Sequence, residues 1–123
     1  MIPLFKVYMS KNAKKEVGKV LDSGFIGQGP VVEKFEELLR KRFNNELVVT
    51  TNSGTSAEHL AIRLLKNPDI NDNSKWPGIQ DGDEALCTSL TCTATNWPVL
   101  ANNMKIKWVD VDPLNLNMDL DDL

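Results

Sequence analysis

The chain has 123 residues, 41% of them apolar and 25% charged, and its formal net charge is −3. These values predict one small globular domain and exclude a disordered chain. The apolar runs are too short for a membrane span, and no basic stripe marks a nucleic-acid partner. The N-terminal residues lack the apolar core of a signal peptide, so we expect a cytoplasmic protein.

Two helices joined by a loop are predicted before residue 44. The first covers residues 11–23, where the apolar residues share one helix face, with Ser10 as its cap and Gly24 at its end. The loop 24–30 then has three glycines and one proline in seven positions. Pro30 suits the first turn of a second helix, whose apolar stripe extends to about residue 43.

A strand and a third helix are predicted next. Residues 47–51 are mostly β-formers, and the apolar residues from Ala57 to Leu65 again share one helix face. The segment between them, Asn-Ser-Gly-Thr-Ser, is short and rich in hydroxyl groups. The sequence therefore predicts a corner at which a strand turns into a helix.

The second half of the chain predicts two more strands, 84–89 and 105–111, with a short helix at 93–102 between them. Pro98 is compatible with that helix only in its first turn. Residues 66–82 form a long polar loop, which we interpret as a surface excursion rather than a functional loop, because only Trp76 and Ile79 could pack. The last residues resemble the start of a helix capped by Asn117 or Asp119. The alternation of helices and strands predicts an α/β fold with mostly parallel pairing.

The cysteines and the single histidine offer little chemistry by themselves. Cys87 and Cys92 are separated by four residues, and only His59 could join them, whereas a zinc site needs about four ligands. We therefore expect buried free thiols rather than a metal site. His59 falls off the apolar face of its helix and has no partner in the sequence, which favours an exposed residue over a catalytic one.

The corner at residues 53–56 is the candidate binding site. Backbone N–H groups at the start of a helix point toward one place, where the helix dipole favours an anion, and the hydroxyls of Ser53, Thr55 and Ser56 add donors. The patterns of a P-loop and of a dinucleotide-binding loop are absent. A structural alternative remains open: Thr55 and Glu58 match a capping box, which would only start the helix.

Four stretches resemble the N-terminal part of the DegT/DnrJ/EryC1/StrS family of pyridoxal-phosphate sugar aminotransferases, in the family's order and at similar spacing. They are GFIGQGPVVEKFEELL, TNSGTSAEHLAI, GDEALCTSLTCTATNWPVLANN and KWVDVDPLNLNMD. Each stretch alone is weak, but together they cover nearly the whole chain. The resemblance implies the large domain of the type I pyridoxal-phosphate (aspartate aminotransferase-like) fold and a homodimer with active sites at the subunit interface.

The resemblance also implies roles for individual residues. Ser53, Gly54, Thr55 and Ser56 would hold the phosphate of pyridoxal 5'-phosphate, and the loop residues Gly27, Gln28 and Gly29 would line the substrate entrance. Cys92 takes the position at which many relatives carry an aromatic residue that stacks on the cofactor ring, and a thiol packs there more weakly. Asp110 and Asp112 match a strand-end D-x-D, which we interpret as structural.

Enzymes of this kind need a lysine that binds the cofactor covalently and an aspartate against the ring nitrogen. No lysine here lies in a matching motif, so we expect no catalytic residue in the chain. We interpret residues 1–123 as one incomplete domain, an N-terminal fragment of the cofactor-binding large domain. The parent enzyme would transfer an amino group from Glu or Gln to a nucleotide-linked keto-sugar. The alternatives are a sugar dehydratase of the same family and a non-catalytic phosphate-binding module.

The sheet of such a fragment would be incomplete. By the resemblance, the strands that neighbour strand 47–51 in the family come later than residue 123. Strand 47–51 would then either move beside strand 84–89 or pair with a second copy of the chain. We expect the second outcome, an oligomer, because the apolar helix faces would otherwise meet water.

Overall fold

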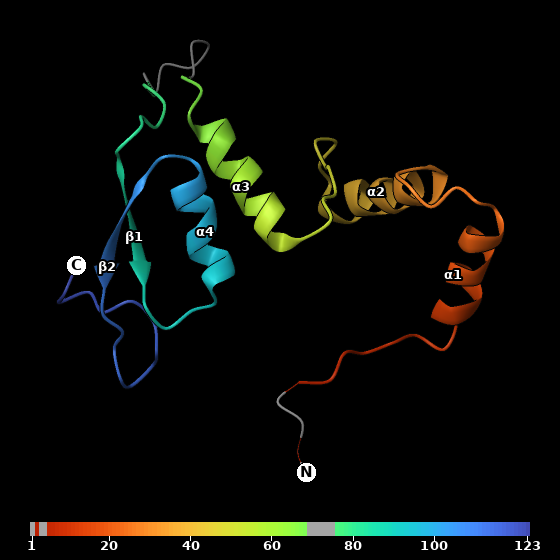
Figure 1. The fold of residues 1–123 in the computed structure, drawn as a ribbon, viewed down its shortest axis with the longest axis horizontal. Coiled ribbons are helices and arrows are strands. Elements are labelled where there is room, and N and C mark those ends of the chain that lie inside the picture. Colours follow the sequence, from red (N-terminus) through yellow and green to blue (C-terminus); the bar gives the residue numbers. More distant parts are fainter. Residues whose placement is uncertain (1, 3–4, 69–75) are drawn as a thin grey trace. The chain divides into compact units, whose positions relative to one another are not determined.

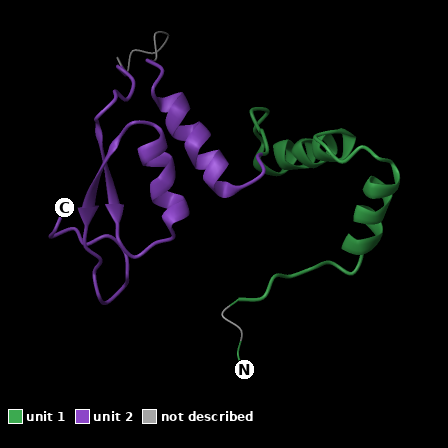
Figure 2. Cartoon of the chain, in the orientation of Figure 1, with its two compact units in different colours: residues 1–50 green, residues 51–123 purple. Residues whose placement is uncertain are grey.

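The computed structural model describes residue 2, residues 5–68 and residues 76–123 (Figure 1). The chain divides into two compact units, residues 1–50 and residues 51–123, shown in two colours in Figure 2. Each unit has its own helices, and both strands belong to the second unit.

The first unit contains α1 (Ala13–Asp22) and α2 (Pro30–Phe43). Gly24 follows α1 with a left-handed φ of 70°, and Pro30 is the first residue of α2, so both helix boundaries are confirmed. The prediction that Ser10 caps α1 is wrong. Its hydroxyl accepts the N–H of Asn12 at 3.3 Å, and the helix begins after Asn12.

The prediction of a strand at residues 47–51 is also wrong. Among the described residues, this segment pairs with no strand, and its backbone instead bonds to side chains of α2. The guanidinium of Arg40 donates to the carbonyls of Glu46 and Val48 at 3.2 Å each, and the carboxylate of Glu36 accepts the N–H of Thr50 at 2.8 Å. A β-forming sequence makes a strand only when a neighbouring strand supplies partners for its backbone, and here α2 supplies several of them.

The second unit contains α3 (Gly54–Leu65), β1 (Glu84–Thr88), α4 (Thr93–Ala101) and β2 (Lys105–Val109). The strands pair in parallel, with Glu84 opposite Lys105 and Thr88 opposite Val109. Helix α4 packs against β2, and α3 packs against α4 (Figure 1). Val99 of α4 and Val109 of β2 are buried between these layers, with 6% and 1% of their surface exposed. This arrangement confirms the predicted α/β class with parallel pairing.

Pro98 is the sixth residue of α4, beyond the first turn in which it was expected. A proline in that place removes one backbone hydrogen bond from the helix. Its ring is fully buried, and its carbonyl accepts the side-chain amide of Asn102 at 2.8 Å. Burial of an apolar ring opposes the cost of the missing bond, which explains why the helix continues through this residue.

The C-terminal residues form turns, so the predicted helix capped by Asn117 or Asp119 is wrong. Val111 makes an antiparallel bridge with Met118, and Asp119 donates its N–H to the carbonyl of Asp110 at 2.9 Å. The carboxylates of Asp110 and Asp112 accept backbone N–H groups of Val111 and Leu114 at 2.8 Å each. Both aspartates therefore stabilise the turn that follows β2, which agrees with the structural role expected from the sequence.

The loop 66–82 is only partly described, because residues 69–75 lie outside the described residues. The indole N–H of Trp76 and the backbone N–H of Ile79 both donate to the carbonyl of Leu65 at 3.0 Å. The N–H of Gly82 donates to the carbonyl of Asn103 at 2.7 Å. The described part of the loop is thus fastened to the ends of α3 and α4. In the residues that the structure describes, no helix has the length and apolar character of a membrane span.

Candidate functional site

The corner at residues 53–56 is the start of α3. Ser53 is the N-cap, with extended backbone angles, and its hydroxyl oxygen accepts the N–H of Ser56 at 3.1 Å. The alternative capping box is wrong, because Thr55 is the second residue of the helix rather than its cap. The predicted corner between an extended segment and a helix is confirmed, although the segment before it is not a strand.

Two N–H groups at this corner are available to a ligand. The first turn of a helix has N–H groups without an intrahelical acceptor. The hydroxyl oxygen of Ser53 accepts the N–H of Ser56. The first backbone hydrogen bond of the helix runs from the N–H of Ala57 to the carbonyl of Ser53 at 3.1 Å. In the described parts of the chain, the N–H groups of Gly54 and Thr55 have no hydrogen-bond acceptor. The corner therefore fits an anion such as a phosphate group.

The hydroxyl groups of the corner differ in their availability. The hydroxyl of Ser53 donates to that of Ser56 at 3.0 Å, and Ser56 in turn donates to the side-chain carbonyl of Asn52 at 2.8 Å. The hydroxyl of Thr51 donates to the carbonyl of Ser53 at 2.8 Å. These bonds fix the shape of the turn and occupy two of the three predicted hydroxyl donors. The third hydroxyl is that of the half-buried Thr55, and it has no hydrogen-bond acceptor among the described residues.

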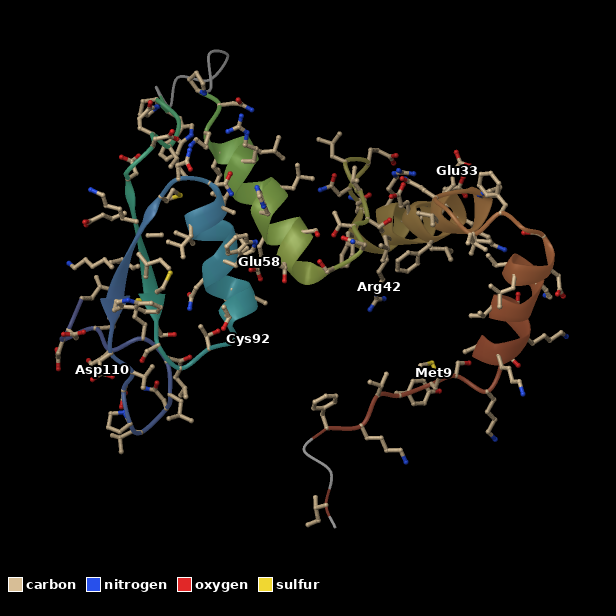
Figure 3. All side chains as sticks on the ribbon, in the orientation of Figure 1. Met9, Glu33, Arg42, Glu58, Cys92 and Asp110 are labelled. Atoms are coloured by element: carbon tan, nitrogen blue, oxygen red, sulfur yellow. The ribbon has the colours of Figure 1, made fainter. Side chains whose placement is uncertain are left out.

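Cys92 lies at the start of α4, at the end of the loop that follows β1 (Figure 3). It is the N-cap residue and its thiol is exposed, with no hydrogen bond that caps the helix. Helices α3 and α4 begin at the same end of the second unit, the end toward which both strands run (Figure 1). Ligands of parallel α/β sheets bind outside that end. The fold thus brings the corner and Cys92 to one side of this unit.

The loop residues Gly27, Gln28 and Gly29 belong to the first unit. Gln28 and Gly29 line a pocket of about 260 Å³ together with Glu33 and Glu36 of α2. The ring of Phe25 lies so close to Gly29 that a β-carbon there would be 2.3 Å from it. The Phe25 ring thus packs over Gly29, and the pocket is lined by the amide of Gln28 from the loop and by the carboxylates of Glu33 and Glu36 from α2.

Two polar clusters were missed by the sequence reasoning. Glu36 and Arg40 lie on the helix α2 and bind the segment before the corner, and Asn102 with Lys66 joins α3 to α4. The only signal in the sequence was a glutamate inside an otherwise apolar helix face, which by itself does not reveal its partner. Both cysteines are free thiols, but the prediction that they are buried is wrong, because Cys92 is exposed and Cys87 is half-buried. Partial burial raises the pKa of Cys87. His59 is half-buried rather than exposed, and its carbonyl accepts the amide of Asn102 at 3.3 Å.

Comparison with known proteins places this geometry in a larger context. Residues 7–123 match the model of the DegT/DnrJ/EryC1/StrS aminotransferase family. GDP-4-keto-6-deoxy-D-mannose 3-dehydratase from Escherichia coli O55:H7 is 29% identical over 109 residues, which are 89% of this chain and 26% of that protein.

Solved structures show the same fold. The sugar aminotransferase CalS13 from Micromonospora echinospora is 45% identical with a TM-score of 0.76, and the match covers 99% of this chain and 30% of that one. The E. coli dehydratase with bound hydrated PLP is 27% identical with a TM-score of 0.77, and the match covers 97% of this chain and 29% of that one. The chain thus spans between a quarter and a third of these relatives, and the predicted type I fold is confirmed.

Proposed function

The chain belongs to the DegT/DnrJ/EryC1/StrS aminotransferase family, and we propose that it forms the phosphate-binding part of a pyridoxal-phosphate-dependent sugar aminotransferase. The observation that carries this proposal is the pair of N–H groups of Gly54 and Thr55, which have no acceptor among the described residues. They lie at the start of a helix, where the backbone favours a doubly charged phosphate.

In this proposal, the residues of the corner bind and orient the cofactor. Gly54 and Thr55 donate their N–H groups to phosphate oxygens, and the hydroxyl of Thr55 adds a third donor. Ser53 and Ser56 keep the turn in shape through their mutual hydrogen bonds. Cys92, exposed at the same side of the unit, packs against the ring in place of an aromatic residue. Pyridoxal phosphate, when bound, supplies the electron sink for amino transfer.

The substrate in this proposal is a nucleotide-linked keto-sugar, and Glu or Gln is the amino donor. The name of the E. coli relative supports the sugar class, since that protein acts on a GDP-linked keto-sugar. The loop of Gly27, Gln28 and Gly29 would meet the sugar, because its pocket offers the acceptors that hydroxyl groups need. The same relative also supports the second candidate, a sugar dehydratase, which would use the same phosphate corner.

In both cases the 123-residue chain binds cofactor but carries no catalytic residue. None of its lysines lies in a motif that resembles the cofactor-binding one. We further propose that the complete enzyme is a homodimer in the cytoplasm.

The experiment compares pyridoxal 5'-phosphate with pyridoxal, which lacks the phosphate, as ligands of the full chain. Both are titrated by equilibrium dialysis, and cofactor absorbance is followed with glutamate present. We expect the phosphorylated compound to bind more tightly, reversibly, and without amino transfer. Equal binding of the two compounds would contradict the phosphate site. Turnover of glutamate would contradict the absence of catalytic residues.

A further inference from the structure

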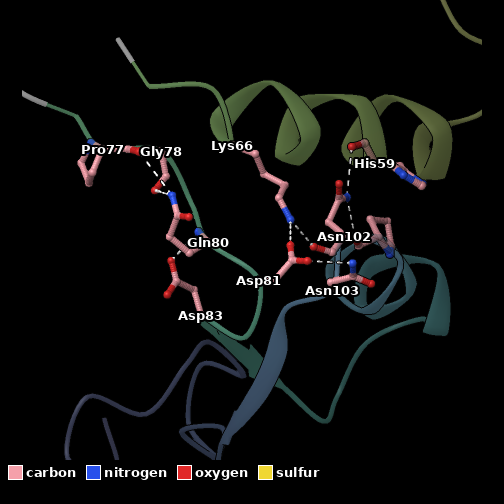
Figure 4. Close-up of polar contacts among 10 residues, drawn as sticks. His59, Lys66, Pro77, Gly78, Gln80, Asp81, Asp83, Asn102 and Asn103 are labelled. Carbon is pink, nitrogen blue, oxygen red and sulfur yellow. Dashed lines mark hydrogen bonds and ion pairs between the residues drawn. The ribbon is translucent and has the colours of Figure 1, made fainter. Parts of the chain in front are cut away.

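Four polar side chains join the end of α3 to the end of α4, and we call them the α3–α4 network: Lys66, Asp81, Asn102 and Asn103 (Figure 4). Asn102 follows α4 directly and is only 3% exposed. Its side-chain amide donates to the carbonyl of Pro98 in α4 at 2.8 Å and to the carbonyl of His59 in α3 at 3.3 Å. One buried amide group thus bonds to both helices.

Lys66 makes the second connection between the helices. It follows α3, its side chain is 13% exposed, and its ammonium group donates to the carbonyl of Asn102 at 2.9 Å. The same ammonium pairs with the carboxylate of Asp81, which also accepts the side-chain amide of Asn103 at 3.1 Å. The loop before β1 is thereby held against both helix ends.

These hydrogen bonds differ from the apolar contacts between α3 and α4, because each one requires its donor and acceptor in defined positions. Burial of apolar surface is not directional, so by itself it does not require one particular donor to meet one particular acceptor. A buried donor is different, because the loss of its acceptor leaves a desolvated N–H without a partner, which destabilises the fold. The amide of Asn102 can reach the carbonyl of His59 while it stays bonded to Pro98 only when α3 has this position on α4, so this amide selects the register.

The candidate site lies a short distance from this contact. Gly54 is five residues before His59, a rise of about 7.5 Å along a helix. Both helices begin at the same end of the unit, so the register of α3 on α4 decides where the corner lies relative to Cys92 (Figure 1).

We infer that Asn102 is a positioning residue, which sets the register of α3 on α4 and thereby the place of the Gly54 and Thr55 N–H groups relative to Cys92. This inference deepens the proposed function and rests on it. Asn102 acts through α3 and does not touch the ligand.

The test uses a nitroxide label on Cys92 of the full chain, in a Cys87→Ser background, and measures the broadening of the backbone amide signals of Gly54 and Thr55 by NMR. Asn102→Leu removes both donors at similar size. Asn103→Gly is the matched control, because it loses only the contact with Asp81 and glycine accepts the left-handed φ of 60° at this position. Affinity for inorganic phosphate is measured separately on unlabelled protein.

We expect Asn102→Leu to stay folded by circular dichroism and to change the broadening of both amide signals, whereas Asn103→Gly changes neither signal. A folded Asn102→Leu protein with unaltered broadening would overturn the inference. If that variant does not fold, Asn102→Ala replaces it, because it removes the same two donors, and unaltered broadening there has the same meaning. A parent chain that binds no phosphate would contradict the proposed function alone, because the label reports the position of α3 without any ligand.

Discussion

The carboxylate of Glu36 accepts two hydrogen bonds from Thr50, from its backbone N–H at 2.8 Å and from its hydroxyl at 2.9 Å. Glu36 lies inside α2 and is only 8% exposed, and the guanidinium of Arg40 pairs with its other oxygen at 3.2 Å. One buried carboxylate thus holds a segment 14 residues away along the chain.

Replacing this carboxylate should release the segment. Glu36→Gln loses the charge opposite Arg40 and keeps only one acceptor oxygen, so we expect faster hydrogen exchange at the Thr50 amide. Glu37→Gln is the control, because Glu37 is exposed on the same helix. Equal exchange rates at Thr50 in the two variants would contradict the role given to Glu36.

The same contact should weaken in acid. The N–H and hydroxyl of Thr50, and then Arg40, hold the pKa of Glu36 below its ordinary value of 4.5. A carboxyl whose pKa is lowered by folding contributes stability above its ordinary pKa and loses it as the pH falls through the lowered value. We expect Thr50 protection to be constant from neutral pH to about pH 5 and to fall below pH 4.5, after correction for intrinsic exchange. Protection that is unchanged down to pH 2 would show that the charge is not needed.

The cap of α3 should be worth a measurable amount of stability. Ser53→Ala removes the oxygen that accepts the N–H of Ser56, and such a loss costs about 1 kcal/mol. Urea unfolding followed by circular dichroism measures it, with Ser53→Asn as the control, because asparagine caps helices as well as serine does. If both variants lose the same stability, the hydroxyl does not act as a cap.

Gly78 should tolerate no side chain. Its φ is 77°, and a β-carbon there would lie 2.3 Å from the carbonyl oxygen of Lys66. A left-handed conformation costs an L-residue about 1–2 kcal/mol even without a clash, so we expect Gly78→Ala to lower the free energy of unfolding by at least that much. Gly18→Ala is the comparison, because nothing lies near its β-carbon position inside α1. A neutral Gly78→Ala would mean that the loop contacts α3 differently.

The chain should self-associate in solution. Several large apolar side chains of both units are more than half exposed, and such patches favour association. They include Phe35, Leu38, Phe43, Trp97 and Trp108. Both edges of the β1–β2 sheet also lack a neighbour among the described residues. Sedimentation equilibrium should give a mass above that of the 13.8 kDa monomer, and a monomer at high protein concentration would contradict this expectation.

Local patterns in the sequence were sufficient wherever local contacts decide the structure. Helix α2 was predicted from its apolar stripe, from Pro30 at its start and from a turn after Phe43, and all three are present. The parallel strands β1 and β2 followed from the alternation of β-forming runs with the short helix between them. At the site, the residue types of the corner predicted the helix start, but the cap is Ser53 and not Thr55, the one cap expected there from the sequence.

The failures have a common physical origin in long-range partners. Residues 47–51 favour a strand by composition, but no described strand bonds to them, and Glu36 and Arg40 supply partners instead. Pro98 is accepted within α4 because its ring is buried, which the local sequence does not show. The network around Asn102 joins residues more than 30 positions apart, so no spacing rule could have found it.

The central claim is that the N–H groups of Gly54 and Thr55 bind phosphate, and a titration of the full chain with inorganic phosphate, followed by amide chemical shifts, tests it most directly. We expect the signals of Gly54 and Thr55 to shift together and to saturate. Thr55→Val should weaken binding about fivefold, the equivalent of about 1 kcal/mol for one hydrogen bond. If the signals of Gly54 and Thr55 do not move, whether or not other signals shift, the claim is contradicted.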